Sequence, residues 1–99
     1  GVGTAGSANI GDKYAMFEAI HGSAVRMIET GRGQYANPTS LFKAVEMMLR
    51  HIGFVEKADR LAKAMQICNE ENKYVITGRD DGATCKEYSD YLMSVIESL

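Results

Sequence analysis

The single proline of the chain, Pro38, marks a change in the kind of sequence. After it, apolar residues recur every three or four positions, which is the spacing of an amphipathic helix. Before it, residues 1–37 lack this spacing and hold seven of the ten glycines, at positions 1, 3, 6, 11, 22, 31 and 33. We therefore expect a part made of loops and one strand, residues 1–37, followed by a helical part, residues 38–99.

Three helices are predicted in the second part. The first follows Asn37, whose side chain can accept hydrogen bonds from free backbone amides, and starts with Pro38, where the missing N–H costs nothing. The second covers about residues 55–69. The third opens with Thr84 and Glu87, whose spacing is that of a capping box.

Two short apolar stretches, residues 15–20 and 74–77, are predicted to be buried strands. Residues 78–82, rich in glycine and aspartate, indicate a turn. The segments that flank the first strand, residues 6–14 and 21–38, are interpreted as loops. The expected fold class is α/β, with about two short strands and three amphipathic helices.

Composition sets limits on function. A length of 99 residues allows one domain at most. A net charge of −2 argues against a protein that binds nucleic-acid backbones, which needs a basic surplus. No apolar run is long enough for a membrane span, and no secretory signal is visible. Two cysteines favour a reducing compartment, such as the cytoplasm or a mitochondrial matrix. Because the chain opens with glycine, a segment of a larger protein is an open possibility.

The loop after the first strand carries the most chemistry. Glu18 and His21 stand at the end of an apolar strand, followed by small residues that let a ligand approach the backbone. Arg26 and Arg32 are candidate partners of a phosphate group. This pattern fits a nucleotide-binding loop, and the alternative is an ordinary solvated loop. The first six residues, GVGTAG, match the dinucleotide fingerprint, but neither a preceding strand nor a following helix is predicted, so the match is interpreted as accidental.

Three stretches together resemble the decarboxylating β-hydroxyacid dehydrogenases, the family of isocitrate, isopropylmalate and homoisocitrate dehydrogenases. They are GSANIGDKYAMFEAIHGSA, then ANP, then a helix with MMLRHIG. Within this family, these stretches are most similar to the isocitrate dehydrogenases. The resemblance implies a coenzyme-binding, C-terminal part of a large α/β domain, in which the helices cover the sheet. It also implies an oxidative decarboxylation that uses NADP or NAD and Mg²⁺ or Mn²⁺.

The resemblance also assigns residues to the coenzyme. Ile10 is expected near the adenosine, and Glu18 near the nicotinamide ribose. The backbone of Ala36 and the side chain of Asn37 are expected at the adenine edge. The loop around the adenosine ribose and pyrophosphate is expected to consist of His21, Gly22, Ser23 and Ala24.

Coenzyme choice depends on Arg26 in this resemblance. NADP-specific relatives place a base at this position to pair with the 2′-phosphate, whereas NAD-specific ones place an acid. We therefore expect NADP in preference to NAD. However, Val25 replaces the family's usual proline, and the segment up to Asn37 is about three residues longer than in many relatives.

The metal ligands, the substrate arginines and the catalytic side chains of the family are expected on the rest of the enzyme chain, or on the partner of a homodimer. The 99 residues alone are then expected to be inactive. Two alternatives stay open. One is a segment of an isopropylmalate or homoisocitrate dehydrogenase, and the other is a non-catalytic helical interaction module.

Overall fold

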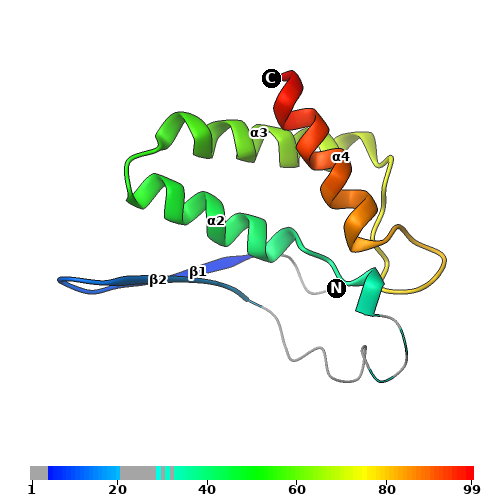
Figure 1. The fold of residues 1–99 in the computed structure, drawn as a ribbon, viewed down its shortest axis with the longest axis horizontal. Coiled ribbons are helices and arrows are strands. Elements are labelled where there is room, and N and C mark those ends of the chain that lie inside the picture. Colours follow the sequence, from blue (N-terminus) through cyan, green and yellow to red (C-terminus); the bar gives the residue numbers. More distant parts are fainter. Residues whose placement is uncertain (1–4, 21–28, 30, 32) are drawn as a thin grey trace. The chain divides into compact units, whose positions relative to one another are not determined.

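The structure is a computed structural model that describes residues 5–20, 29, 31 and 33–99 (Figure 1). In chain order, its elements are β1 (Gly6–Ile10), β2 (Ala15–Ala19), the 3₁₀ helix η1 (Gly33–Tyr35), α2 (Thr39–His51), α3 (Val55–Glu71) and α4 (Cys85–Ser98). The expected α/β class is confirmed. The described residues divide into two compact units. Unit 1 holds residues 5–20 and 39–62, and unit 2 holds residues 29, 31, 33–38 and 63–99.

Unit 1 is built on a β-hairpin. β1 and β2 pair antiparallel, from Gly6 opposite Ala19 to Ile10 opposite Ala15. The strand predicted at residues 15–20 is therefore confirmed, but the prediction that it is buried is wrong, because most of its side chains are exposed. The loop predicted at residues 6–14 is also wrong for its first half. The small and polar residues of β1 do not predict a strand, but pairing with β2 supplies its backbone hydrogen bonds.

Helix α2 packs along one face of the hairpin at very close range (Figure 1). Ser40 and Ala44 of this helix are buried, and the backbone N–H of Ala5 donates to Ser40 Oγ at 3.2 Å. A Cβ atom added to Gly6 would lie 2.8 Å from the backbone nitrogen of Ala44. Only a glycine at position 6 therefore allows α2 to pack this close to β1.

The start and the buried face of α2 differ from prediction. The helix begins at Thr39, so Pro38 rather than Asn37 immediately precedes it, one residue later than predicted. The residues that lie against the hairpin are small, whereas Leu41 and Ile52, two of the apolar residues that recur every three or four positions after Pro38, are 55% and 54% exposed. The hairpin packs against the face of α2 that carries Ser40 and Ala44. Some of the larger apolar side chains of the helix are therefore exposed to solvent.

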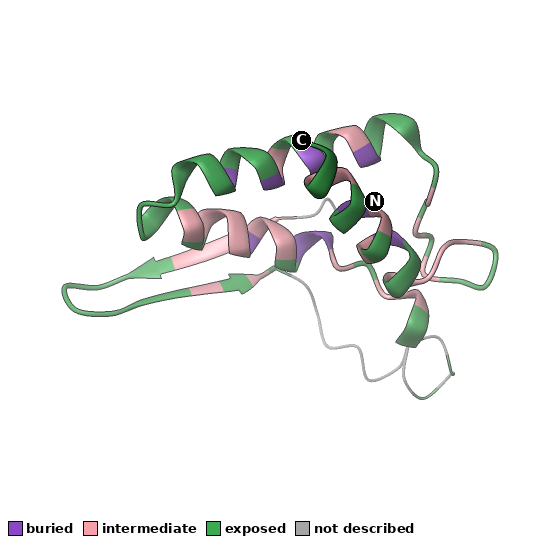
Figure 2. Ribbon diagram, turned by 45° about the horizontal axis from the view of Figure 1, so that its top comes forward, coloured by how far each residue is buried: buried purple, intermediate pink, exposed green. Residues whose placement is uncertain are grey.

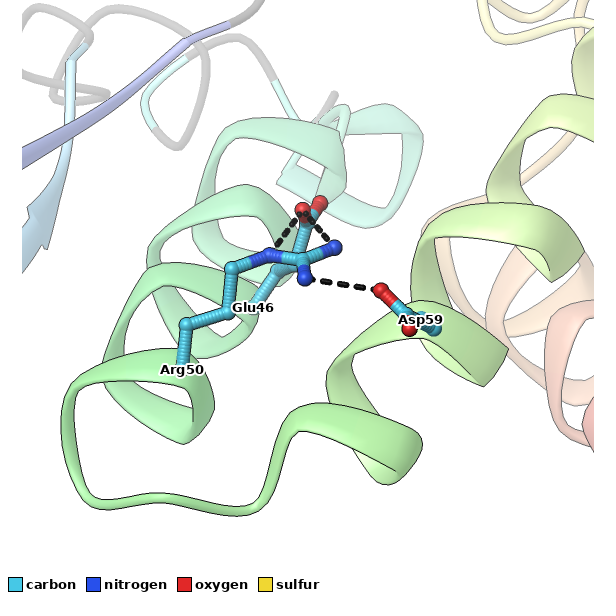
Figure 3. A network of polar contacts seen from close by, with 3 residues as sticks. All are labelled: Glu46, Arg50 and Asp59. Carbon is cyan, nitrogen blue, oxygen red and sulfur yellow. Dashed lines mark hydrogen bonds and ion pairs between the residues drawn. The ribbon is translucent and has the colours of Figure 1, made fainter.

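A polar network joins the end of α2 to the start of α3 (Figure 3). The Arg50 guanidinium donates to Asp59 Oδ1 at 2.7 Å and to Glu46 Oε2 at 3.1 Å. The hydrogen bond to Asp59 and then that to Glu46 raise the pKa of Arg50. Gly53, with φ of 95°, reverses the chain between the two helices, as a glycine after a helix end is expected to do.

Unit 2 has its own buried residues, where the ribbon of Figure 2 is coloured purple. On α3 they include Met65 and Cys68, and on α4 they are Tyr88 and Leu92. The predicted capping box of α4 is confirmed: Thr84 Oγ1 accepts from the N–H of Glu87, while the Glu87 carboxylate accepts from the N–H of Thr84. Cys68 is also buried.

The loop between α3 and α4 closes on itself. The N–H of Ala83 donates to the carbonyl of Val75 at 2.8 Å, and Thr77 Oγ1 donates to Asp81 at 2.6 Å. A Cβ atom on Gly82 would lie 2.5 Å from Thr77 Oγ1, so the two sides of the loop touch. The strand predicted at residues 74–77 is wrong, because these residues hydrogen-bond within the loop instead of forming a ladder. The turn predicted at residues 78–82 is confirmed.

None of the helices among the described residues is both long enough and apolar enough to cross a membrane.

Candidate functional site

Five of the nine residues assigned to the coenzyme lie outside the described residues. They are His21, Gly22, Ser23, Ala24 and Arg26. Their roles stay predictions. The other four fall into two pairs, one in each unit.

Ile10 and Glu18 belong to the hairpin of unit 1. Ile10 is the last residue of β1 and is 62% exposed, whereas Glu18 lies in β2, opposite Ser7. Side chains alternate between the two faces of a strand, so the register places Ile10 and Glu18 on opposite faces of the hairpin. Their residue pairs lie three steps apart along the ribbon, which is roughly 10 Å.

The two faces offer different surroundings. The face with Ile10 also carries Gly6 and Phe17, and the Phe17 ring lies 5.5 Å from the His51 ring of α2. Glu18 lies on the other face, and its side chain is exposed. Ile10 therefore suits an apolar contact at the hairpin end, and Glu18 suits a hydrogen bond to a hydroxyl group.

Ala36 and Asn37 belong to unit 2 and follow η1 directly. The N–H of Ala36 donates to the carbonyl of Gly33 at 3.2 Å, which fixes the turn. Ala36 is half-buried and Asn37 is exposed. An exposed amide beside a fixed backbone is a suitable partner for the donor and acceptor edge of a purine.

The described residues do not fit a metal site. Within residues 5–20, 29, 31 and 33–99, no group of three or more histidine, cysteine, aspartate or glutamate side chains is placed to hold an ion. These described residues therefore do not provide a set of ligands for a divalent metal ion.

Comparison with known proteins decides the family. The family model described as isocitrate/isopropylmalate dehydrogenase matches residues 1–92. The chain belongs to this family. Its members are oxidative decarboxylases that depend on NAD or NADP and on a divalent metal, and they typically form dimers.

Curated relatives include more than one enzyme of the family. The isocitrate dehydrogenase [NADP] of Helicobacter pylori (strain ATCC 700392 / 26695) is 37% identical over 101 residues, covering 100% of this chain and 23% of that protein. The 3-isopropylmalate dehydrogenase of Archaeoglobus fulgidus is 42% identical over 73 residues, covering 74% of this chain and 22% of that protein. The isocitrate dehydrogenase [NADP] of Rickettsia typhi is 62% identical over 52 residues, covering 52% of this chain and 10% of that protein.

The chain thus spans less than a quarter of the length of these curated relatives. No solved structure matches it. The resemblance read from the sequence is confirmed at the level of the family. The comparisons leave the substrate open between isocitrate and isopropylmalate.

Proposed function

We propose that this chain is the coenzyme-binding part of an NADP-dependent isocitrate dehydrogenase, which converts isocitrate to 2-oxoglutarate and CO₂. The observation that carries the proposal is the 37% identity to the isocitrate dehydrogenase [NADP] of Helicobacter pylori across the whole chain. The similarity to the isocitrate dehydrogenase [NADP] of Pseudomonas aeruginosa, 38% over 95% of the chain, supports it too.

The share of this chain that each similarity covers favours isocitrate over 3-isopropylmalate as the substrate. The similarity to the Archaeoglobus 3-isopropylmalate dehydrogenase covers 74% of the chain, whereas that to the Helicobacter enzyme covers all of it. A segment of an isopropylmalate dehydrogenase is therefore the second candidate.

When bound, NADP supplies the hydride acceptor for oxidation of the substrate's hydroxyl carbon, after which the β-carboxylate is lost as CO₂. The residues of this chain bind and orient the coenzyme. Asn37 hydrogen-bonds the adenine edge beside the backbone of Ala36, and Ile10 gives the adenosine an apolar contact. Glu18 accepts a hydrogen bond from the nicotinamide ribose.

The loop after β2 completes the coenzyme site. His21, Gly22, Ser23 and Ala24 surround the adenosine ribose and the pyrophosphate, where small residues allow a close approach of the backbone. Arg26 pairs with the 2′-phosphate of NADP, because a guanidinium is always charged and matches the geometry of a phosphate. This pairing is the reason to prefer NADP over NAD.

The substrate-binding side chains and the ligands of Mg²⁺ or Mn²⁺ come from the rest of the enzyme or from its partner in a homodimer. The 99 residues alone are then inactive, and the enzyme works in the cytoplasm or a mitochondrial matrix.

The test is NADP reduction, followed by absorbance at 340 nm, by the natural protein that carries this chain. With isocitrate and Mg²⁺ present we expect turnover, and with 3-isopropylmalate we expect none. Turnover of 3-isopropylmalate alone would favour the second candidate. Absence of turnover with both, together with tight binding of another protein, would favour the helical interaction module instead.

A further inference from the structure

The hairpin of unit 1 is held against α2 at two separate points. The first is the close approach of Gly6 to the backbone of Ala44. The second lies further along the ribbon, at the residue pair Ala8–Phe17, where the Phe17 ring lies 5.5 Å from the His51 ring and is tilted by 53° to it. This distance and this tilt fall within the range of favourable aromatic pairs.

The two contacts advance in the same direction along β1 and along α2, which run side by side in Figure 1. Along the hairpin they are two steps apart, which is roughly 7 Å. Along α2 they extend from Ala44 to His51, which is roughly 10 Å. Two separated points fix the direction of a ribbon against a helix, whereas a single point leaves the ribbon free to pivot. The His51 contact therefore sets the angle between the hairpin and α2.

This angle matters most at the far end of the hairpin, where Ile10 lies. The pair that Ile10 forms with Ala15 is four steps from the pair that contains Gly6, which is roughly 13 Å. A pivot of about 5° around the Gly6 contact would move Ile10 by about 1 Å. A displacement of this size is enough to weaken a binding contact. Glu18 would move less, because its pair is only one step from the Gly6 pair.

We propose that His51 is a positioning residue for the coenzyme, which acts through Phe17 and holds the hairpin at the angle at which Ile10 meets the adenosine. This inference rests on the proposed function, because that function places Ile10 there. It extends the set of residues that determine coenzyme affinity to the end of α2, since His51 acts on the hairpin and not on the coenzyme itself.

The test measures KM and kcat of the natural enzyme that carries this chain and of its His51→Leu variant, which has an apolar side chain but no flat ring. An aromatic pair biases the balance between two orientations by roughly two- to tenfold. A ligand that binds only one orientation loses apparent affinity in proportion to the population of that orientation. The KM for NADP should therefore rise by about two- to tenfold, while kcat and the KM for isocitrate change by less than about twofold.

Two further variants separate positioning from stability. His51→Phe retains a ring beside Phe17, so its KM for NADP should stay near that of the natural enzyme. Arg60→Ala, at an exposed residue of α3 in the same unit, should leave all three constants unchanged. A merely structural role of His51 would instead lower kcat per total protein, through loss of folded enzyme, and leave both KM values unchanged. If His51→Leu does not fold, His51→Gln takes its place with the same expected result.

A double-mutant cycle tests the route through Phe17. Phe17→Leu should raise the KM for NADP as His51→Leu does, and the two changes together should be no worse than either alone, because both break one contact. Effects that multiply would overturn this inference and leave the proposed function standing. An unchanged KM in His51→Leu, or a His51→Phe variant as impaired as His51→Leu, would do the same. Failure of the natural enzyme to reduce NADP or NAD would overturn both.

Discussion

Replacing Gly6 by alanine is expected to destabilise unit 1 by forcing β1 and α2 apart. The added Cβ atom would lie 2.8 Å from the Ala44 nitrogen, 2.9 Å from Met47 Sδ and 3.0 Å from the Ala44 Cα. The sulfur belongs to a flexible side chain and can move. The two backbone atoms belong to a helix and can move only if the whole helix shifts.

Two effects of opposite sign set the size of the change. Alanine restricts the unfolded chain more than glycine does, which stabilises the fold by about 0.4–1 kcal/mol where the native backbone accepts it. Overpacking of a close contact costs about 1–3 kcal/mol. The cost exceeds the gain, and we expect Gly6→Ala to lower the free energy of unfolding by about 1–2 kcal/mol.

Gly11→Ala is the matched control. Its added Cβ would lie 3.4 Å from the Tyr14 carbonyl oxygen, which is an ordinary contact, and its φ is not positive. This variant should therefore show only the effect on the unfolded chain and be neutral or slightly stabilised. The assay is urea unfolding followed by circular dichroism. If Gly6→Ala proves as stable as the Gly11→Ala control, the close approach of β1 and α2 is incorrect.

Four further outcomes are expected. Thr84→Ala should lower the free energy of unfolding by about 1 kcal/mol through loss of the cap, while Thr84→Ser should retain most of it in the same urea titration. Burial, and after it the charge of Glu71, raises the pKa of the Cys68 thiol from its ordinary value of 9.0. The folded chain then keeps a proton that the unfolded chain loses, so stability should fall as the pH rises above that value, and Cys68→Ala should remove this part of the fall. In the natural enzyme, His21→Ala should raise the KM for NADP with little change for isocitrate, and equal coenzyme KM values would remove His21 from the site. Arg26→Asp should shift preference from NADP towards NAD in the same assay, and an unchanged preference would show that another group pairs with the 2′-phosphate.

Features encoded in a few neighbouring residues could be predicted from the sequence. The capping box at Thr84 needs only the spacing to Glu87, and the end of α2 needs only Gly53. Both signals act within one helical turn, so nothing distant in the chain overrides them.

Features that depend on distant partners could not be predicted. β1 is a strand because β2 pairs with it, although the sequence GSANI has little strand character. Conversely, the apolar stretch at Tyr74 has strand character but no partner strand among the described residues. The buried face of α2 depends on a distant partner in the same way, since Gly6 admits the small residues of the helix and leaves Leu41 exposed.

The candidate site, too, could be predicted only in part from the sequence. The residues were assigned by resemblance to a family, and comparison confirmed the family. That Ile10 and Glu18 lie on opposite faces of the hairpin depends on strand register, which a list of site residues does not contain. The contact between η1, which precedes Ala36 and Asn37, and α4 joins two elements fifty residues apart in the sequence, so no local motif predicts it.

The loop between α3 and α4 has a consequence for how this region can change during evolution. Its base is closed by the bond from Ala83 to Val75 and by the contact of Gly82 with Thr77, while residues 79–81 at its tip are exposed. Extra residues inserted at the tip would project into solvent at a modest entropic cost. Lineages can therefore lengthen or shorten this loop freely at its tip, while deletions that reach its base would displace the start of α4.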